Sequence, residues 1–335
     1  MFGLLLVIIA TGLGSVSPDL SGDNYGLEQG LPTQFVLVSF DATPRGDVRP
    51  EKYRFVQMLE RIRSAAPPNY SGPAPSFTFF FNTMILQLRN GWIPPPYTRW
   101  ARDSSWRRWR KNPNLQQSRV IGHGQNPQTI ATAVKTLKYM QKMGMELASH
   151  GVRHYSGRGW TMEQWHAEFA EHARILALHK LPKPAGYRAP FLQTSKAGFA
   201  RADDPAFHVM QEYGMRYDSS KGSRLQPRWP RRVGATGIWE IGIPTYKRKD
   251  GPMLLFGKSG TNKWAFIHIL REQFERRYHT NRAPLILGGH GEFSSITERF
   301  LIEVCYRPGV HCATYSEFIQ YLECHPELEG RTQLL

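Results

Sequence analysis

The chain has 335 residues, of which 41% are hydrophobic, and a formal net charge of +16. This length and apolar content allow one large domain or two small ones with a sizeable core, and they exclude a chain too polar to fold. The basic excess suits an anionic partner, such as a cell-wall polymer, a membrane surface or a nucleic acid, and it is equally compatible with a basic, solvated surface.

The chain begins with an uninterrupted apolar run over residues 1–10, followed by the small residues Gly14, Ser15 and Ser17. The run is short for a membrane span, and no other stretch is long and apolar enough to be one. We expect a secretory signal peptide over residues 1–18, although no basic residue precedes the run, and a short membrane anchor is the alternative. From this signal peptide we expect the protein to be secreted, periplasmic or associated with the cell envelope, with no stable membrane span after processing.

Strand-like apolar runs then alternate with amphipathic helical stretches. Strands are expected at residues 35–40, 76–81, 145–149, 186–188, 215–217, 238–241, 285–287 and 310–313. Helices are expected at residues 50–64, 126–142, 161–179, 205–213, 262–279, 295–304 and 316–323. Asn126 and Thr161 are typical helix N-caps. The alternation predicts a parallel sheet, either a barrel or open, in which chemistry gathers at the carboxyl ends of the strands.

One segment interrupts this alternation. Residues 92–111, WIPPPYTRWARDSSWRRWRK, hold four tryptophans, five arginines and one acidic residue. We expect a surface insertion over about residues 91–118. Aromatic faces stack on sugar rings and arginines pair with anions, so Trp106 and Trp109 are candidate substrate contacts. The alternative is that the tryptophans pack onto the domain.

Three cysteines, Cys305, Cys312 and Cys324, lie near the C-terminus. After export, one pair could form a disulfide and leave one free thiol, and the sequence does not choose the pair. Their spacing is not typical of a zinc site, so we expect a structural role.

Residues that can carry chemistry follow several predicted strands. His150 and His154 flank a glycine-containing turn, where two imidazoles four residues apart can bind one divalent ion such as Zn, Co, Ni or Fe. Asp41 ends the first strand as a candidate base or ligand, with a turn cap as the alternative. His290 follows two glycines that allow a close backbone approach.

Taken in order, these motifs resemble those of the polysaccharide deacetylases, carbohydrate esterase family 4, which have the NodB-homology fold. The resemblance covers about residues 35–328. Its motifs are Ser39-Phe40-Asp41-Ala42, His150-x3-His154, Arg188-Ala189-Pro190, Tyr217-Asp218-Ser219-Ser220 and Leu287-Gly288-Gly289-His290. The residues of these motifs are most similar to those of the chitin-deacetylase-like branch, as in Arg188-Ala189-Pro190-Phe191-Leu192 and Ile238-Trp239-Glu240-Ile241.

The resemblance implies an α/β fold, a distorted (β/α) barrel of parallel strands with outer helices, as a single catalytic domain over residues 30–330. It implies a hydrolase of linear amide C–N bonds that removes acetyl groups from N-acetylglucosamine units of a chitin-like or peptidoglycan polymer. The implied partner is thus an acetylated polysaccharide or cell-wall glycan, and the implied cofactor is a divalent metal, first of all zinc, with cobalt or nickel as alternatives.

The resemblance also implies residue roles. Asp41 would be the catalytic base, oriented by Arg188, and His290 the acid, supported by Asp218. The remaining implied roles are metal binding by His150 and His154, oxyanion binding by the backbone near Phe191, and sugar contacts by Trp229 or Trp239.

One departure affects the metal site. The family's second Asp, normally the third metal ligand, is Ala42 here, and a methyl group cannot coordinate. The site would use two protein ligands with waters, or another residue such as Asp47. A carbohydrate-binding pseudoenzyme is therefore the alternative. A nucleic-acid-binding protein, suggested by the charge and by WRRWRK, is disfavoured by the apparent signal peptide and the lack of a recognised motif.

Overall fold

The computed structural model describes residues 30–44, 46–88, 124–194, 203–223, 227–248, 251–254, 263–290 and 294–332. The predicted signal peptide at residues 1–18, the predicted insertion at about residues 91–118, and Trp106 and Trp109 within it lie outside these ranges. Among the helices of the described ranges, none is long and apolar enough to cross a membrane.

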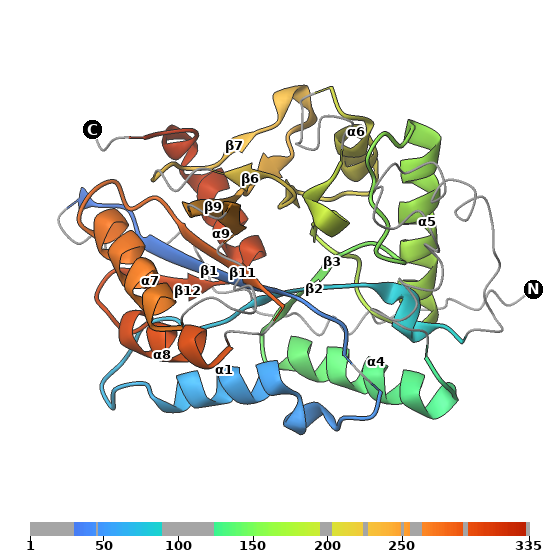
Figure 1. Ribbon diagram of the computed structural model, residues 1–335, viewed down its shortest axis with the longest axis horizontal. Helices are drawn as coiled ribbons and strands as arrows, with labels where there is room; N and C mark the ends of the chain where they lie inside the picture. The colour runs from blue at the N-terminus through green and yellow to red at the C-terminus, as the bar shows by residue number, and fades with distance from the viewer. Residues whose placement is uncertain are drawn as a thin grey trace, which may run out of the picture.

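Within these ranges, a nine-stranded sheet forms the centre of the fold (Figure 1). Eight strands follow the order β11-β1-β2-β3-β4-β5-β8-β7, and β12 also pairs with β1. All pairings are parallel except that of β7 with β8. The strands are β1 (Gln34–Asp41), β2 (Thr78–Phe81), β3 (Glu146–Ser149), β4 (Gly186–Tyr187), β5 (Tyr217–Asp218), β7 (Arg231–Arg232), β8 (Trp239–Glu240), β11 (Leu285–Gly289) and β12 (Val310–Ala313).

The helices are those that the sequence predicts, with small shifts at their ends. They are α1 (Arg54–Ser64), α4 (Pro127–Lys142), α5 (Met162–Leu178), α6 (Pro205–Glu212), α7 (Lys263–Tyr278), α8 (Ser294–Val304) and α9 (Tyr315–Cys324). Asn126 and Thr161 cap α4 and α5 through reciprocal capping boxes, which confirms both predicted N-caps. The predicted helix over 50–64 is divided, because extended backbone at Tyr53 separates the 3₁₀ turn Pro50–Lys52 from α1.

A second, three-stranded sheet was not predicted. It contains β6 (Gly222–Ser223), β9 (Ile243–Arg248) and β10 (Gly251–Leu254), in the order β10-β9-β6. Its strands are short and rich in Gly, Pro, Lys and Arg, so they lack the alternating apolar pattern that indicates a strand.

Strand β1 is buried along all eight residues, which accounts for its nearly continuous apolar sequence. Residues 34–37 of β1 pair with β12, residues 36–40 pair with β11, and residues 39–41 pair with β2. Alternate side chains point to opposite faces of the sheet. Val36, Val38 and Phe40 join one apolar cluster, and Phe35 and Leu37 join another.

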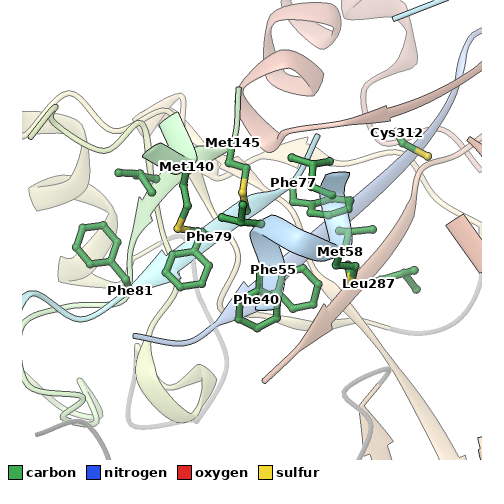
Figure 2. Packing of buried hydrophobic residues seen from close by; sticks show 14 of the residues in the cluster. Phe40, Phe55, Met58, Phe77, Phe79, Phe81, Met140, Met145, Leu287 and Cys312 are labelled. Carbon is green, nitrogen blue, oxygen red and sulfur yellow. The ribbon is translucent and has the colours of Figure 1, made fainter. Parts of the chain in front are cut away.

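The first cluster packs α1 against the sheet, as Figure 2 shows. Phe40 stacks on Phe55 of α1 with ring centroids 4.1 Å apart, and Phe77 meets Phe40 edge-on at 5.8 Å. This packing holds the end of β1, and therefore Asp41, in place beside α1.

A disulfide joins Cys305, just after α8, to Cys312 in β12, and Cys324 is the free, exposed cysteine. The structure thus selects one of the three pairings that the sequence left open.

Candidate active site

Asp41, the last residue of β1, forms a buried ion pair with Arg188, which directly follows β4. Arg188 Nη1 lies 2.5 Å from Asp41 Oδ1, while Nη2 donates to Ser39 Oγ at 2.8 Å and to Tyr315 OH at 3.1 Å. The guanidinium also lies 4.0 Å above the Phe80 ring. These contacts fix Arg188, so Arg188 can fix the carboxylate, as the resemblance implied.

The electrostatics keep Asp41 ionised. Burial by itself raises the pKa of Asp41, but the positive charge of Arg188, followed by His150 and His290, holds the pKa below its ordinary value. An ionised carboxylate can accept a proton at neutral pH.

His150 and His154 come together in the loop after β3. Their ring centroids lie 4.9 Å apart, and His154 has φ +59°. His150 Nδ1 lies 2.7 Å from the carbonyl oxygen of Arg188 and donates to it, which leaves Nε2 as the unprotonated nitrogen. Burial lowers the pKa of His150, and burial together with the nearby His150 lowers that of His154 to about 3. Both imidazoles are therefore neutral, the form that binds metals.

The loop between the two histidines is braced by residues that the sequence analysis did not select. Glu168 of α5 accepts a 2.6 Å hydrogen bond from the Val152 amide, and the Asn82 side chain donates to the His150 carbonyl. Gly151 has φ +75°, and a Cβ there would lie 2.7 Å from Glu168 Oε1. The position of Glu168 on the apolar face of a predicted helix could have indicated this role, because a glutamate is rarely buried without a partner.

One cavity of about 620 Å³ gathers the predicted chemical residues Asp41, His150, His154 and His290. Its other lining residues are Ala42, Thr43, Val48, Lys52, Tyr53, Arg54, Asn82 and Ile85. His290 is exposed just beyond β11, and Arg54 Nη2 donates to its carbonyl oxygen at 2.5 Å. Lys52 and Arg54, which were not predicted, add two cations to the lining of the cavity.

The remaining predicted residues lie around this cavity or away from it. The Phe191 ring meets the His154 ring edge-on, with centroids 4.8 Å apart. Asp218 is buried and accepts from the amide and hydroxyl of Ser220 at 2.9 and 2.6 Å. Ser220 in turn accepts from the Ala189 amide at 2.7 Å, so Asp218 supports the segment after Arg188.

Neither predicted sugar-binding tryptophan of the core lines the cavity. Trp229 lines a second cavity, and Trp239 is buried beneath the Arg232 guanidinium, 4.4 Å from it. A direct sugar contact by either tryptophan stays a prediction that this arrangement does not favour.

The donor set fits a divalent cation only in part. His150 and His154 supply two neutral, anchored imidazoles, but Ala42 lines the cavity where a carboxylate would be needed. Asp47 is exposed and is not part of the lining. Among the described residues, no group of three or more His, Cys, Asp and Glu side chains could hold a metal ion.

Several solved structures are similar to this chain. A probable polysaccharide deacetylase from Pseudomonas aeruginosa PAO1 superposes with a TM-score of 0.50 at 13% identity, over 87% of this chain and 91% of that one. A family 4 carbohydrate esterase from Streptomyces lividans, in complex with acetate, gives 0.41 at 11% identity over 83% and 91%. The Xyl-CE4 domain of a xylanase from the hindgut metagenome of Trinervitermes trinervoides gives 0.43 at 12% over 90% and 94%. No curated protein matches the chain.

The fold is therefore the distorted (β/α) barrel of the polysaccharide deacetylase type. Residues 120–217 match the family model described as polysaccharide deacetylase, a span that includes His150, His154 and Arg188. This part of the chain is therefore similar to the polysaccharide deacetylases, which are hydrolases of amide bonds. The resemblance to the chitin-deacetylase-like branch stays a prediction.

Proposed function

We propose that the protein is a metal-assisted N-deacetylase that removes acetyl groups from N-acetylglucosamine units of a chitin-like or peptidoglycan polymer. The observation that carries this proposal is the gathering of Asp41, His150, His154 and His290 in one cavity. These residues come from the ends of three strands that lie far apart in the sequence.

In the proposed reaction, Asp41 takes a proton from the attacking water. Arg188 holds the carboxylate through the 2.5 Å ion pair and keeps it ionised, so that it is ready to accept the proton. The water oxygen then forms a bond to the acetyl carbon of the substrate.

His290 supplies the proton that the leaving amine needs. It lies at the exposed edge of the cavity, and Arg54 holds its backbone, so its imidazole can meet a polymer from outside. Cleavage of the C–N bond then yields acetate and a free amine on the sugar.

A bound divalent ion, first of all zinc, with cobalt or nickel as alternatives, would polarise the amide carbonyl and activate the water. His150 and His154 would hold it. The Arg188 carbonyl, the Asn82 side chain and Glu168 keep the histidine loop in the conformation that this role requires.

A carbohydrate-binding pseudoenzyme is the second candidate, and Ala42 is the observation that favours it. Activity remains the leading proposal because the base, its arginine, both histidines and the acid all line or adjoin the same cavity.

We also propose export to the cell envelope or beyond, with residues 30–330 as one catalytic domain. The apolar run at residues 1–10 and the Cys305–Cys312 disulfide support export, because disulfides persist in oxidising compartments.

Acetate release from a panel of acetylated glycans, with and without added zinc, cobalt or nickel, tests the proposal. If the protein is a deacetylase, it releases acetate from at least one N-acetylated glycan, and the rate of release rises when metal is added. Binding of the glycans without release of acetate would favour the pseudoenzyme instead.

A further inference from the structure

A second cavity, of about 390 Å³, shares no lining residue with the candidate active site. It lies among β6, β7, β8 and β9, the start of β11, and α7. We call it the arginine cavity. Its lining residues are Lys221, Gly222, Arg228, Trp229, Pro230, Arg231, Glu240, Gly242, Pro244, Arg277, Pro284 and Ile286.

The lining carries four cations and one carboxylate. Glu240 is matched by Lys221, whose Nζ lies 2.6 Å from Glu240 Oε2. The other three cations of the lining are arginines, Arg228, Arg231 and Arg277. In the part of the chain that the structure describes, neither Arg228 nor Arg231 forms a side-chain ion pair, and both are exposed.

Arg277 brings positive charge to a buried position of the same cavity. Only 2% of this residue is exposed, and its Nη1 donates to the backbone and side-chain oxygens of Gln273, both at 2.9 Å. Burial, followed by the charge of Arg276, lowers the pKa of Arg277 to about 10, so it stays protonated at neutral pH. A bound anion would offset the loss of solvation of this guanidinium.

The walls of the arginine cavity are rigid and partly apolar. The Trp229 indole donates to the Asn281 carbonyl at 3.0 Å and stacks on Phe318 with centroids 6.2 Å apart. Pro230, Pro244 and Pro284 line the remaining wall. Cavities of roughly 300–1,000 Å³ with apolar walls and a few converging polar groups are typical of small-molecule sites.

We propose that the arginine cavity binds a tetrahedral oxyanion, a phosphate or sulfate group. Guanidinium groups donate in a planar fork that matches two oxygens of such a group, and three arginines line this cavity. The cavity can also hold the molecule that carries the group, so the source is either the free ion or a phosphorylated sugar. This site is independent of the deacetylase proposal.

Calorimetric titration at fixed ionic strength, with inorganic phosphate, glucosamine 6-phosphate and glucosamine, tests the site. We expect both phosphates to bind and glucosamine not to bind. Tighter binding of glucosamine 6-phosphate identifies a phosphorylated sugar as the source, whereas equal binding identifies the free ion. Failure of the parent protein to bind either phosphate would overturn the proposal.

The double variant Arg228→Gln/Arg231→Gln locates the binding. It should weaken phosphate binding by about tenfold or more, since hydrogen bonds between charged groups are the strong ones. Lys135→Gln/Lys138→Gln, which removes two exposed charges from α4, is the matched control and should bind like the parent. Equal losses in both variants would indicate nonspecific attraction and overturn the site. Arg277→Lys, which keeps the charge without the fork, should also weaken binding, with thermal unfolding to check that it folds.

Discussion

Arg188 and Asp41 are 147 residues apart in the sequence, and their side chains meet in a buried ion pair with a nitrogen–oxygen distance of 2.5 Å. The parallel sheet brings them together, because Asp41 is the last residue of β1 and Arg188 directly follows β4. Arg188 also contacts Ser39 and Tyr315, so it joins the end of β1 to α9. The carboxylate is thereby held in one orientation before any substrate arrives.

We therefore expect Arg188→Lys to reduce turnover by about 10²-fold, the usual scale for losing a positioned proton-transfer group. Lysine keeps the charge but cannot reach Asp41, Ser39 and Tyr315 together. Arg61→Lys is the matched control, because Arg61 forms an exposed pair with Glu298. The rate of acetate release is compared among the parent and the two variants, on a substrate that the parent deacetylates. A parental rate in Arg188→Lys would contradict the positioning role.

Replacement of both His150 and His154 by Ala should abolish bound divalent metal, because these imidazoles are the nitrogen ligands of the proposed site. Elemental analysis of the purified proteins gives the metal content, and circular dichroism shows whether the fold survives. His208→Ala, at an exposed position on α6, is the control and should keep its metal. An unchanged metal stoichiometry in the double variant would show that the metal binds elsewhere.

Ala42→Asp should tighten metal binding at least tenfold, about 1.4 kcal/mol, because a negative ligand offsets the charge of the cation. The parent should lose metal readily to chelators and gain activity when metal is added. Calorimetric metal titration compares the parent, Ala42→Asp and the neutral control Ala42→Asn. If the parent binds as tightly as Ala42→Asp, another residue supplies the third ligand.

Glu168 should make the stability of the fold depend on pH. Burial raises the pKa of this carboxyl to about 7, above its value in the unfolded chain. The folded state thus holds a proton that the unfolded state releases, so this contribution is fully present below about pH 4.3 and is lost as pH rises to about 7.

Glu168→Gln cannot titrate, but it keeps an oxygen that can accept from the Val152 amide. Its free energy of unfolding should therefore fall less than that of the parent between pH 4.5 and pH 8, as measured by urea denaturation. Glu163→Gln, at an exposed position of the same helix, should behave like the parent. The same pH dependence in parent and Glu168→Gln would refute the assignment.

Much of the fold could be predicted from the sequence because its main elements have strong local patterns. The buried β1 appears as an apolar run, and the caps at Asn126 and Thr161 are encoded within a few residues. The small sheet could not be predicted, because its strands are held by pairing between distant segments rather than by their own propensity.

The part of the candidate site that lies at the ends of strands could also be predicted from the sequence. Asp41, the two histidines and His290 each follow a predicted strand, and a parallel sheet places strand ends at one edge. Glu168, Lys52 and Arg54 could not be predicted, since only the packed structure shows what a charged side chain faces. Trp229 is the opposite case, because an aromatic residue suited to sugar stacking is buried in the wall of another cavity.

The most direct test of the account is acetate release by the parent protein, Asp41→Asn and His290→Ala on N-acetylated chitooligosaccharides with added metal. We expect release by the parent and losses of about 10²-fold or more in each variant, because each removes one proton-transfer group while leaving the histidine pair in place. Parental rates in either variant, on a substrate that the parent deacetylates, would contradict the proposed roles of Asp41 and His290.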